Sequence, residues 1–142
     1  MMRNPDPYAV FNFVVEFNGI QMAGFTEVTG IEAHTEFEEF REGGINHYVH
    51  KLAKETKYGN LTLKRGLTDA TFLWDWYQDV INGVIERKTV SVVLLDARRK
   101  EKRRWIFSDA YPVKWSSSDL NGTSNTVAVE SVELAHHGMR KQ

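Results

Sequence analysis

The chain has 142 residues, the length of one ordinary domain, and 42% of them are hydrophobic, which supplies enough apolar material for a core. Its 18 basic and 19 acidic side chains leave a formal net charge of −1, which excludes a disordered polyelectrolyte and gives no sign of nucleic-acid binding. The absence of cysteine excludes disulfides, thiolate metal sites and cysteine nucleophiles, and is typical of proteins made in a reducing cytoplasm.

The first predicted strand covers residues 10–17, which are mostly apolar and aromatic. Asn18-Gly19 follows as a hairpin-turn signal, because both residues tolerate the positive φ that tight turns between strands require. Residues 20–25 are expected to form the returning strand, and Gly24 and Gly30 interrupt the stretch that follows. The chain therefore begins with a β-hairpin.

Residues 31–38 alternate between less polar and more polar side chains, the pattern of a strand with one face on a core and one in water. The predicted core face holds Ile31, Ala33, Thr35 and Phe37. The predicted water face holds Glu32, His34, Glu36 and Glu38. The alternation breaks at residues 39–40, where we expect a bulge or bend. A row of like charges costs repulsion in a monomer, and it would be useful if that face lined an aqueous channel.

The next segment is interrupted by Gly43-Gly44, and residues 45–58 show no clean period. We therefore expect an extended excursion or long loop there. Another strand follows Gly59, in which Leu61 and Leu63 alternate with polar side chains until Gly66.

A single helix is predicted over about residues 69–82. Thr68 is its expected N-cap, Asp69 lies in the first turn, and Gly83 is a natural C-cap. Apolar side chains recur at three- and four-residue spacing and define one broad face. That face contains Phe72, Leu73, Trp76, Tyr77, Val80 and Ile81, of which Phe72, Leu73, Trp76 and Val80 are expected in the core.

The last third of the sequence is again rich in strand signals. Residues 89–95 are nearly all apolar, residues 98–104 resemble a charged hairpin tip, and strands are expected over 105–107, 111–115 and 127–136. Residues 119–125 form a polar loop. The pattern predicts an α+β chain dominated by antiparallel sheet, a sandwich or barrel with one flanking helix, in a single domain over 1–142.

Candidate chemistry is sparse. The nucleotide-binding, nucleophile-elbow and zinc-protease motifs are absent from the sequence. His136 and His137 could bind a metal, although adjacent strand residues point to opposite faces, and His47 and His50 are a second such pair. The carboxylates Glu32, Glu36 and Glu38 could serve as general acid and base or as a cation site, but a solvated strand face is the simpler interpretation.

Residues 98–104 contain six basic side chains in seven positions. They could bind a phosphate backbone, but no aromatic residues are interleaved with them, so a solvated hairpin tip is the simpler interpretation. Docking of an acidic protein partner is a third possibility. A nucleic-acid-binding β-barrel and a small β-rich metal-binding enzyme thus stay open as alternative functions.

The order of short motifs from Tyr8 to Met139 resembles the tail-tube protein family of contractile phages and of phage-tail-like contractile injection systems. Each motif is weak alone, but their order and spacing are specific. They are Phe11-x-Phe13 with Val15-Glu16, Gly24-Phe25-x-Glu27-Val28-x-Gly30, Phe40-Arg41-Glu42-Gly43-Gly44, Lys57-Tyr58-Gly59-Asn60-Leu61-Thr62-Leu63-Lys64-Arg65-Gly66, Leu73-Trp74-x-Trp76, Leu94-Leu95-Asp96, Arg104-Trp105, Ala110-Tyr111-Pro112-Val113-Lys114-Trp115 and Glu130-x-x-Glu133-Leu134-Ala135-His136.

The resemblance implies a structural protein without catalytic activity, cofactor or metal. Its fold would resemble that of the hemolysin-coregulated protein of type VI secretion. Six subunits would form a ring, and rings would stack into a hollow tube inside a contractile sheath, with a baseplate and spike at the tube's end. Sheath contraction would drive the tube through a target envelope, and the tube would conduct cargo or phage DNA.

Within this hypothesis, the face with Glu32, His34, Glu36 and Glu38 is expected to line the lumen. The segment Gly44, Ile45, Asn46, His47, Tyr48, Val49, His50, Lys51 and Leu52 is expected to contact a neighbouring subunit. The sequence contains neither a membrane-spanning apolar run nor a signal-peptide pattern, so we expect synthesis in the bacterial cytoplasm and no membrane anchor. The sequence fits a subunit of an infecting phage tail, of a bacteriocin-like particle or of an effector-delivering injection system. In each case the subunit could be the main tube protein or a paralogue next to the baseplate.

Overall fold

The computed structural model describes residues 12–40 and 50–141. Within these ranges it contains ten strands and one helix, and every strand pairing is antiparallel. The elements are β1 (Phe13–Phe17), β2 (Ile20–Met22), β3 (Phe25–Thr29), β4 (Ala33–Phe40), β5 (His50–Tyr58), β6 (Leu61–Gly66), α1 (Phe72–Ile81), β7 (Lys88–Leu95), β8 (Glu101–Ser117), β9 (Val129–Ala135) and β10 (Met139–Lys141). The predicted fold class, mainly antiparallel β with one helix, is confirmed.

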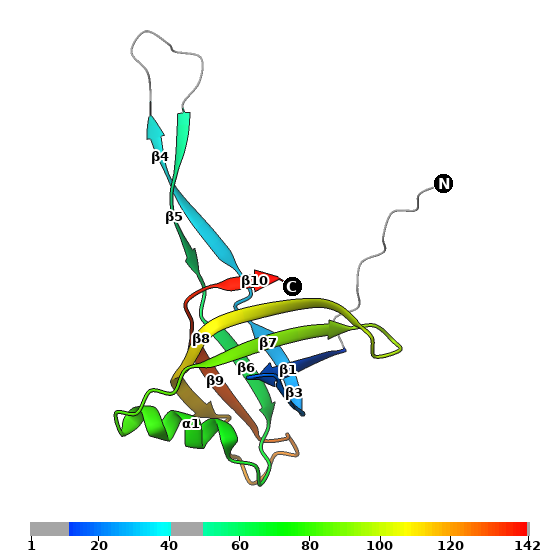
Figure 1. Cartoon of the computed structure of the whole chain (residues 1–142). Helices are drawn as coiled ribbons and strands as arrows, with labels where there is room; N and C mark the ends of the chain where they lie inside the picture. The colour runs from blue at the N-terminus through cyan, green and yellow to red at the C-terminus, as the bar shows by residue number, and fades with distance from the viewer. Residues whose placement is uncertain (1–11, 41–49, 142) are drawn as a thin grey trace.

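Eight strands form one strongly curved sheet that wraps around the core (Figure 1). The strand order is β2-β1-β7-β8-β9-β6-β3, and β10 also pairs with β8. The 17-residue strand β8 pairs with β7 through its first part and with β9 through its second, so it belongs to both halves of the curved sheet. The two short strands predicted over 105–107 and 111–115 are therefore one strand, which continues through Asp109 at a φ of 54° and through Pro112 beside a register shift.

The N-terminal hairpin is shorter than predicted. The turn at Asn18 and Gly19 is confirmed, and both residues have a positive φ. The returning strand β2 ends at Met22, and the chain turns at Gly24, with a φ of 91°, so that β3 leaves β1 and pairs with β6 instead. The short strand β10 lies beyond the last strand that the sequence pattern predicts.

The core lies inside the curve of the sheet, where alternate side chains of each strand point inward. Leu61 and Leu63 of β6 and Val132 and Leu134 of β9 are fully buried, and their neighbours in sequence are partly exposed. Phe107 of β8 lies among them with no exposed surface. The clean period-two pattern of β6 is what made this strand predictable.

The helix packs against this core but begins later than predicted. The hydroxyl of Thr68 accepts a hydrogen bond from the N–H of Ala70, so this residue stabilises a turn ahead of α1 and is not its N-cap. The helix ends at Ile81, and Asn82 is its C-cap, one residue before the predicted Gly83. Gly83 follows with a φ of 85°, and the N–H of Val84 bonds back to the carbonyl of Asp79 at 2.8 Å.

The apolar face of α1 is narrower than its sequence suggests. Leu73 and Trp76 are buried, while Phe72 and Val80 are half-buried. Ile81 was assigned to this face but is 59% exposed, because the helix ends there and the chain leaves the sheet. The indole N–H of Trp76 donates to the carbonyl of Glu86 at 2.7 Å, which ties the helix to the segment leading into β7.

A buried ion pair lies beneath the segment that leads into α1. Arg65 Nε donates to Glu130 Oε1 at 2.6 Å, and the Trp115 indole N–H donates to Glu130 Oε2 at 3.0 Å. Arg65 also donates to the carbonyl of Ala70 at 3.2 Å. One buried carboxylate thus connects β6, β8 and β9, and its arginine partner holds the start of the helical segment.

Candidate functional site

The most distinctive feature of the structure is a two-stranded ribbon, hereafter the arm, which consists of β4 and β5 and projects from the curved sheet (Figure 1). Of the two interpretations of residues 45–58, an extended excursion and a long loop, residues 50–58 fit the first, because they form the extended strand β5. A bulge breaks their period, since Thr35 pairs with Thr56 but Phe37 pairs with Ala53. The bulge predicted at residues 39–40 lies instead at this point, opposite Glu36.

The arm is exposed on both faces. Phe37, Phe40 and Leu52 are each exposed by 50–54%, and Tyr58 at the base is exposed by 40%. The prediction that Ala33, Thr35 and Phe37 face the core of this chain is therefore wrong, while Ile31, just before the arm, is partly buried against it. Alternation shows that two faces of a strand differ, but it does not identify the surface that covers the apolar one.

Cross-strand pairing defines the two faces of the arm, because directly paired residues project on the same side. On one face, hereafter the Phe37 face, the hydroxyls of Thr35 and Thr56 lie 2.8 Å apart, and Lys51 Nζ lies 5.2 Å from the centre of the Phe37 ring. The opposite face, hereafter the Glu36 face, carries His34 and Glu36 near the base. Toward the far end Glu38 lies opposite Leu52, and Phe40 packs beside His50.

The acidic row on the Glu36 face is partly neutralised within the chain. Lys57 Nζ lies 3.0 Å from Glu36 Oε1 and 3.5 Å from Glu55 Oε1. The hydrogen bond to Glu36, followed by the two carboxylate charges, raises the pKa of Lys57 above its usual value. Sequence reasoning missed Lys57 because the period of β5 is broken, although a lysine facing a row of glutamates on the neighbouring strand is a frequent pairing.

Of the residues expected in an inter-subunit segment, the structure describes only the last three. His50, Lys51 and Leu52 form the first residues of β5, at the far end of the arm. Gly44, Ile45, Asn46, His47, Tyr48 and Val49 lie outside the described residues, and so does the histidine pair formed by His47 with His50. Glu32, expected on the acidic face, precedes β4 and lies at the base of the arm beside Gly59.

The paired histidines near the C-terminus have separate structural surroundings. His136 Nδ1 accepts the N–H of Gly138 at 3.1 Å, so its Nε2 carries the proton and donates to the carbonyl of Gly59 at 2.8 Å. His137 is exposed and lies 3.3 Å from Asp109 Oδ2. Among residues 12–40 and 50–141, no group of three or more metal-ligating side chains comes together.

The basic run is divided between a turn and a strand. The turn lies over residues 96–100, where Asp96 Oδ1 accepts the N–H groups of Arg98 and Lys100. Arg104 belongs to β8 and donates to Glu16 and to Glu101 at 2.6 Å each. These contacts, led by that with Glu101, raise the pKa of Arg104 and lower that of Glu101. The interpretation of the whole run as a solvated tip is therefore wrong at its C-terminal end.

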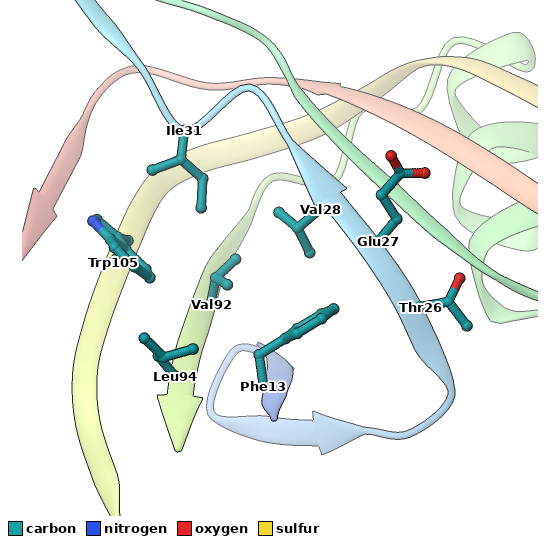
Figure 2. A pocket seen from close by; sticks show the side chains of 8 residues that line it. All are labelled: Phe13, Thr26, Glu27, Val28, Ile31, Val92, Leu94 and Trp105. Atoms are coloured by element: carbon teal, nitrogen blue, oxygen red, sulfur yellow. The ribbon is translucent and has the colours of Figure 1, made fainter. Parts of the chain in front are cut away.

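One open hollow of about 290 Å³ lies between β3 and the strands β1, β7 and β8 (Figure 2). Six apolar side chains face one another across it, and Thr26 and Glu27 lie at its edge. The apolar residues are Phe13, Val28, Ile31, Val92, Leu94 and Trp105. Glu27 is paired with Lys64 at 3.3 Å, so this hollow offers shape and apolar surface without a nucleophile and base.

The helical part of the described structure is too short to cross a bilayer, since α1 has ten residues.

The structure is thus a curved antiparallel sheet with one helix and an exposed two-stranded arm. The chain belongs to the T4-like virus tail tube protein gp19 family, whose model matches residues 9–140. Among curated proteins, no relative matches this sequence.

Solved structures place the chain more narrowly. A chain of the cryo-EM structure of the anti-feeding prophage (AFP) baseplate, 6-fold symmetrised, is 29% identical, with a TM-score of 0.87 over 98% of this chain and 97% of that one. A chain of the extended sheath–tube complex of the PVC extracellular contractile injection system is 25% identical, with a TM-score of 0.86 over 96% and 91%. Hcp1 from Flavobacterium johnsoniae shares the fold at 15% identity, with a TM-score of 0.58 over 92% and 94%.

These findings confirm the resemblance deduced from the motifs. The protein is a tail-tube protein of the contractile-injection-system type, a structural component of an injection particle. Such proteins assemble with themselves into tubes, and the similar chains come from complexes that include a sheath, a baseplate and a tube-terminating cap.

Proposed function

We propose that residues 1–142 act as one domain that forms six-membered rings, and that these rings stack into a hollow tube within a contractile sheath. The tube meets a baseplate and spike at one end, conducts cargo or DNA, and carries out no catalysis of its own. The arm is the observation that carries this proposal. An isolated two-stranded ribbon is marginally stable in water, so one that exposes Phe37, Phe40 and Leu52 needs a covering surface.

The covering surface belongs to another copy of the chain. The arm points away from the curved sheet, which places its far end beyond the body of its own subunit (Figure 1). Contacts between unlike surfaces of identical subunits extend into rings or filaments. The similarity to a chain of a baseplate structure symmetrised six-fold supports a ring of six.

The base of the Glu36 face lines the lumen in this proposal. Glu36 and Glu38 are charged, so water is the appropriate neighbour for the part of the Glu36 face that carries them. The exposed Phe37 ring lies on the opposite face and calls for a protein neighbour. Glu36 pairs with Lys57, and Glu38 makes no ion pair with any described residue, so six subunits would still ring the channel with negative charge. Replacing both glutamates by glutamine should leave folding within about 0.5 kcal/mol of the wild type and change the passage of charged cargo.

The arm is tested by two single substitutions, Phe37→Ser and Leu52→Ser, one on each face. Both side chains are exposed in the subunit, so unfolding of the monomer should change by no more than about 0.5 kcal/mol. Long tubes in negative-stain micrographs should disappear. Leu120→Ser is the matched control, because Leu120 is an apolar side chain that is even more exposed, at 80%, and lies in the loop between β8 and β9. Tubes of normal length from both arm variants would contradict this role of the arm.

A further inference from the structure

Two surfaces of opposite charge lie at opposite ends of β7. The first surrounds the end of α1 and the segment before β7, and we call it the acidic surface. It contains the carboxylates Asp75, Asp79 and Glu86 and the apolar side chains Ile81, Val84 and Ile85, which are exposed by 50–59%. The second consists of the turn between β7 and β8 and the first residues of β8, and we call it the basic tip. It contains Arg98, Arg99, Lys100, Lys102 and Arg103.

The acidic surface is suited to receive a cation. A hollow of about 150 Å³ beside α1 is bounded by the three carboxylates, by Phe72 and Trp76, and by Lys88. Lys88 pairs with Glu86 at 2.8 Å, and its Nζ lies 5.6 and 5.7 Å from the centres of the Phe72 and Trp76 rings. The site thus already holds one ammonium group over aromatic rings.

Two of its carboxylates, those of Asp75 and Asp79, make no ion pair with a described residue, and Lys88 pairs with Glu86. Asp75 accepts a hydrogen bond from the hydroxyl of Thr71 at 2.9 Å, and Asp79 makes no ion pair with residues 12–40 or 50–141. The two lie four residues apart, on one side of α1. Because α1 contains no basic residue, its exposed side keeps an excess of negative charge.

The basic tip has the complementary excess. Residues 96–104 contain six basic and two acidic side chains, and Arg104 is already paired with Glu16 and Glu101. Arg98 and Lys100 make no ion pair with any described residue, and both are exposed. Asp96 holds their backbone N–H groups, so the turn presents these side chains from a fixed loop.

The two surfaces cannot meet within one subunit. Strand β7 begins at Lys88, beside the acidic surface, and ends at Leu95, just before the basic tip. Eight residues of extended strand separate the two surfaces by roughly 25 Å. Figure 1 shows α1 and the β7–β8 turn on opposite flanks of the curved sheet. Complementary patches on opposite flanks join identical subunits head to tail.

We propose that the basic tip of one subunit docks on the acidic surface of its neighbour in the ring, with Arg98 and Lys100 meeting Asp75 and Asp79. This rests on the proposed ring-forming function and specifies a contact within the ring. The aliphatic stems of the basic side chains cover Ile81, Val84 and Ile85, while their charged ends pair with the carboxylates. A second copy of the chain is favoured over another partner because the chain itself supplies both halves in equal number.

The experiment neutralises or reverses the charges on each surface. The variant Asp75→Asn with Asp79→Lys changes the acidic surface, and asparagine keeps an acceptor for the Thr71 hydroxyl. The variant Arg98→Glu with Lys100→Glu changes the tip. Each should raise the concentration for half-maximal ring formation, measured by sedimentation, by roughly tenfold or more. The combination of all four substitutions restores one lysine–glutamate pair across the contact, so it should lower this concentration below that of either parent variant, part of the way back to the wild type.

Salt gives a second measurement. Raising the salt concentration from about 0.1 to about 1 M shortens the screening length from about 10 to about 3 Å. The differences between the variants in the concentration for half-maximal ring formation should therefore become smaller at high salt. Asp119→Lys, in the exposed loop after β8, is the matched charge control and should assemble as the wild type does. Thermal unfolding of each monomer shows whether a variant folds.

Several outcomes would overturn the proposal. Folded variants that form rings at the wild-type concentration exclude the contact, as does a combined variant no better than its parents. If the tip variant loses only binding to DNA, or the α1 variant only binding to sheath protein, the surfaces serve those partners instead. If the wild type forms no rings, the proposed function itself is rejected. If Phe37→Ser forms rings that do not stack, the contact within the ring does not depend on the arm.

Discussion

Removal of the Glu130 carboxylate tests whether the buried ion pair organises the join between the sheet and the helix. Glu130 is 2% exposed and Arg65 is 4% exposed, so neither charge can be solvated by water when its partner is lost. In Glu130→Ala, the guanidinium of Arg65 loses its 2.6 Å contact and the Trp115 indole loses its acceptor. The guanidinium remains buried, and the indole remains partly buried.

The expected cost is about 3–5 kcal/mol, the usual cost of breaking a buried pair from one side. Domains of this size unfold with about 5–15 kcal/mol, so this loss takes a large share of the stability. The double variant Arg65→Met with Glu130→Leu removes both charges and fills the space. It should therefore be more stable than Glu130→Ala, because no uncompensated charge is left in the core.

Urea unfolding of the monomer, followed by tryptophan fluorescence, measures these differences. A double-mutant cycle from Arg65→Ala, Glu130→Ala and their combination gives the coupling energy directly. A cost below about 1 kcal/mol for Glu130→Ala, or additive single costs, would refute the reasoning and show that water reaches this pair.

Three further predictions concern single positions. Trp76→Ala should destabilise the monomer by about 3–5 kcal/mol in the same unfolding assay, because a buried aromatic and its hydrogen bond are lost; an unchanged melting temperature would contradict its place in the core. Gly30→Ala should lower the yield of folded protein, because at a φ of 94° the added methyl would clash with the carbonyl of Asn60; normal expression and stability would contradict this. The hydrogen bond from the Lys100 N–H, and after it the one from the Arg98 N–H, lowers the pKa of Asp96 below its ordinary value of 3.8. The Asp96 carboxylate should therefore stabilise the turn fully above pH 3.8, and this stabilisation should be lost as the pH falls through the lowered pKa. Amide exchange at Lys100 should follow this loss, and an Asp96→Asn variant with the same acid dependence would refute it.

Strands with a regular period were predictable from the sequence. Leu61 and Leu63 alternate with polar neighbours, and both are buried in β6. The β5 strand escaped prediction because a bulge between Ala53 and Thr56 shifts its faces halfway along. The start of α1 was placed too early because Thr68 resembles a cap, but its hydroxyl bonds to Ala70 in a preceding turn.

The candidate site was only partly predictable, for a reason that concerns assembly. The sequence separates Glu36 and Glu38 from Phe37, and the arm does carry them on opposite faces. In the sequence, a strand whose apolar face would be covered by another subunit shows the same alternation of polar and apolar residues as a strand that packs on the core of its own chain. Only the structure, in which Phe37 is 53% exposed, distinguishes the two.

The length of β8 has a consequence for how the chain folds. The pairing of β8 with β7 requires closure of only a short turn. The pairing of β6 with β9 joins residues some 70 positions apart in the sequence, since Leu61 pairs with Leu134. We expect the β7–β8 hairpin to form first, because short loop closures cost the least entropy. The second half of β8 then has an unpaired edge to which β9 can form backbone hydrogen bonds. Since one strand serves both halves of the sheet, neither half can detach alone, and unfolding should follow a single cooperative transition with coincident fluorescence and circular dichroism curves.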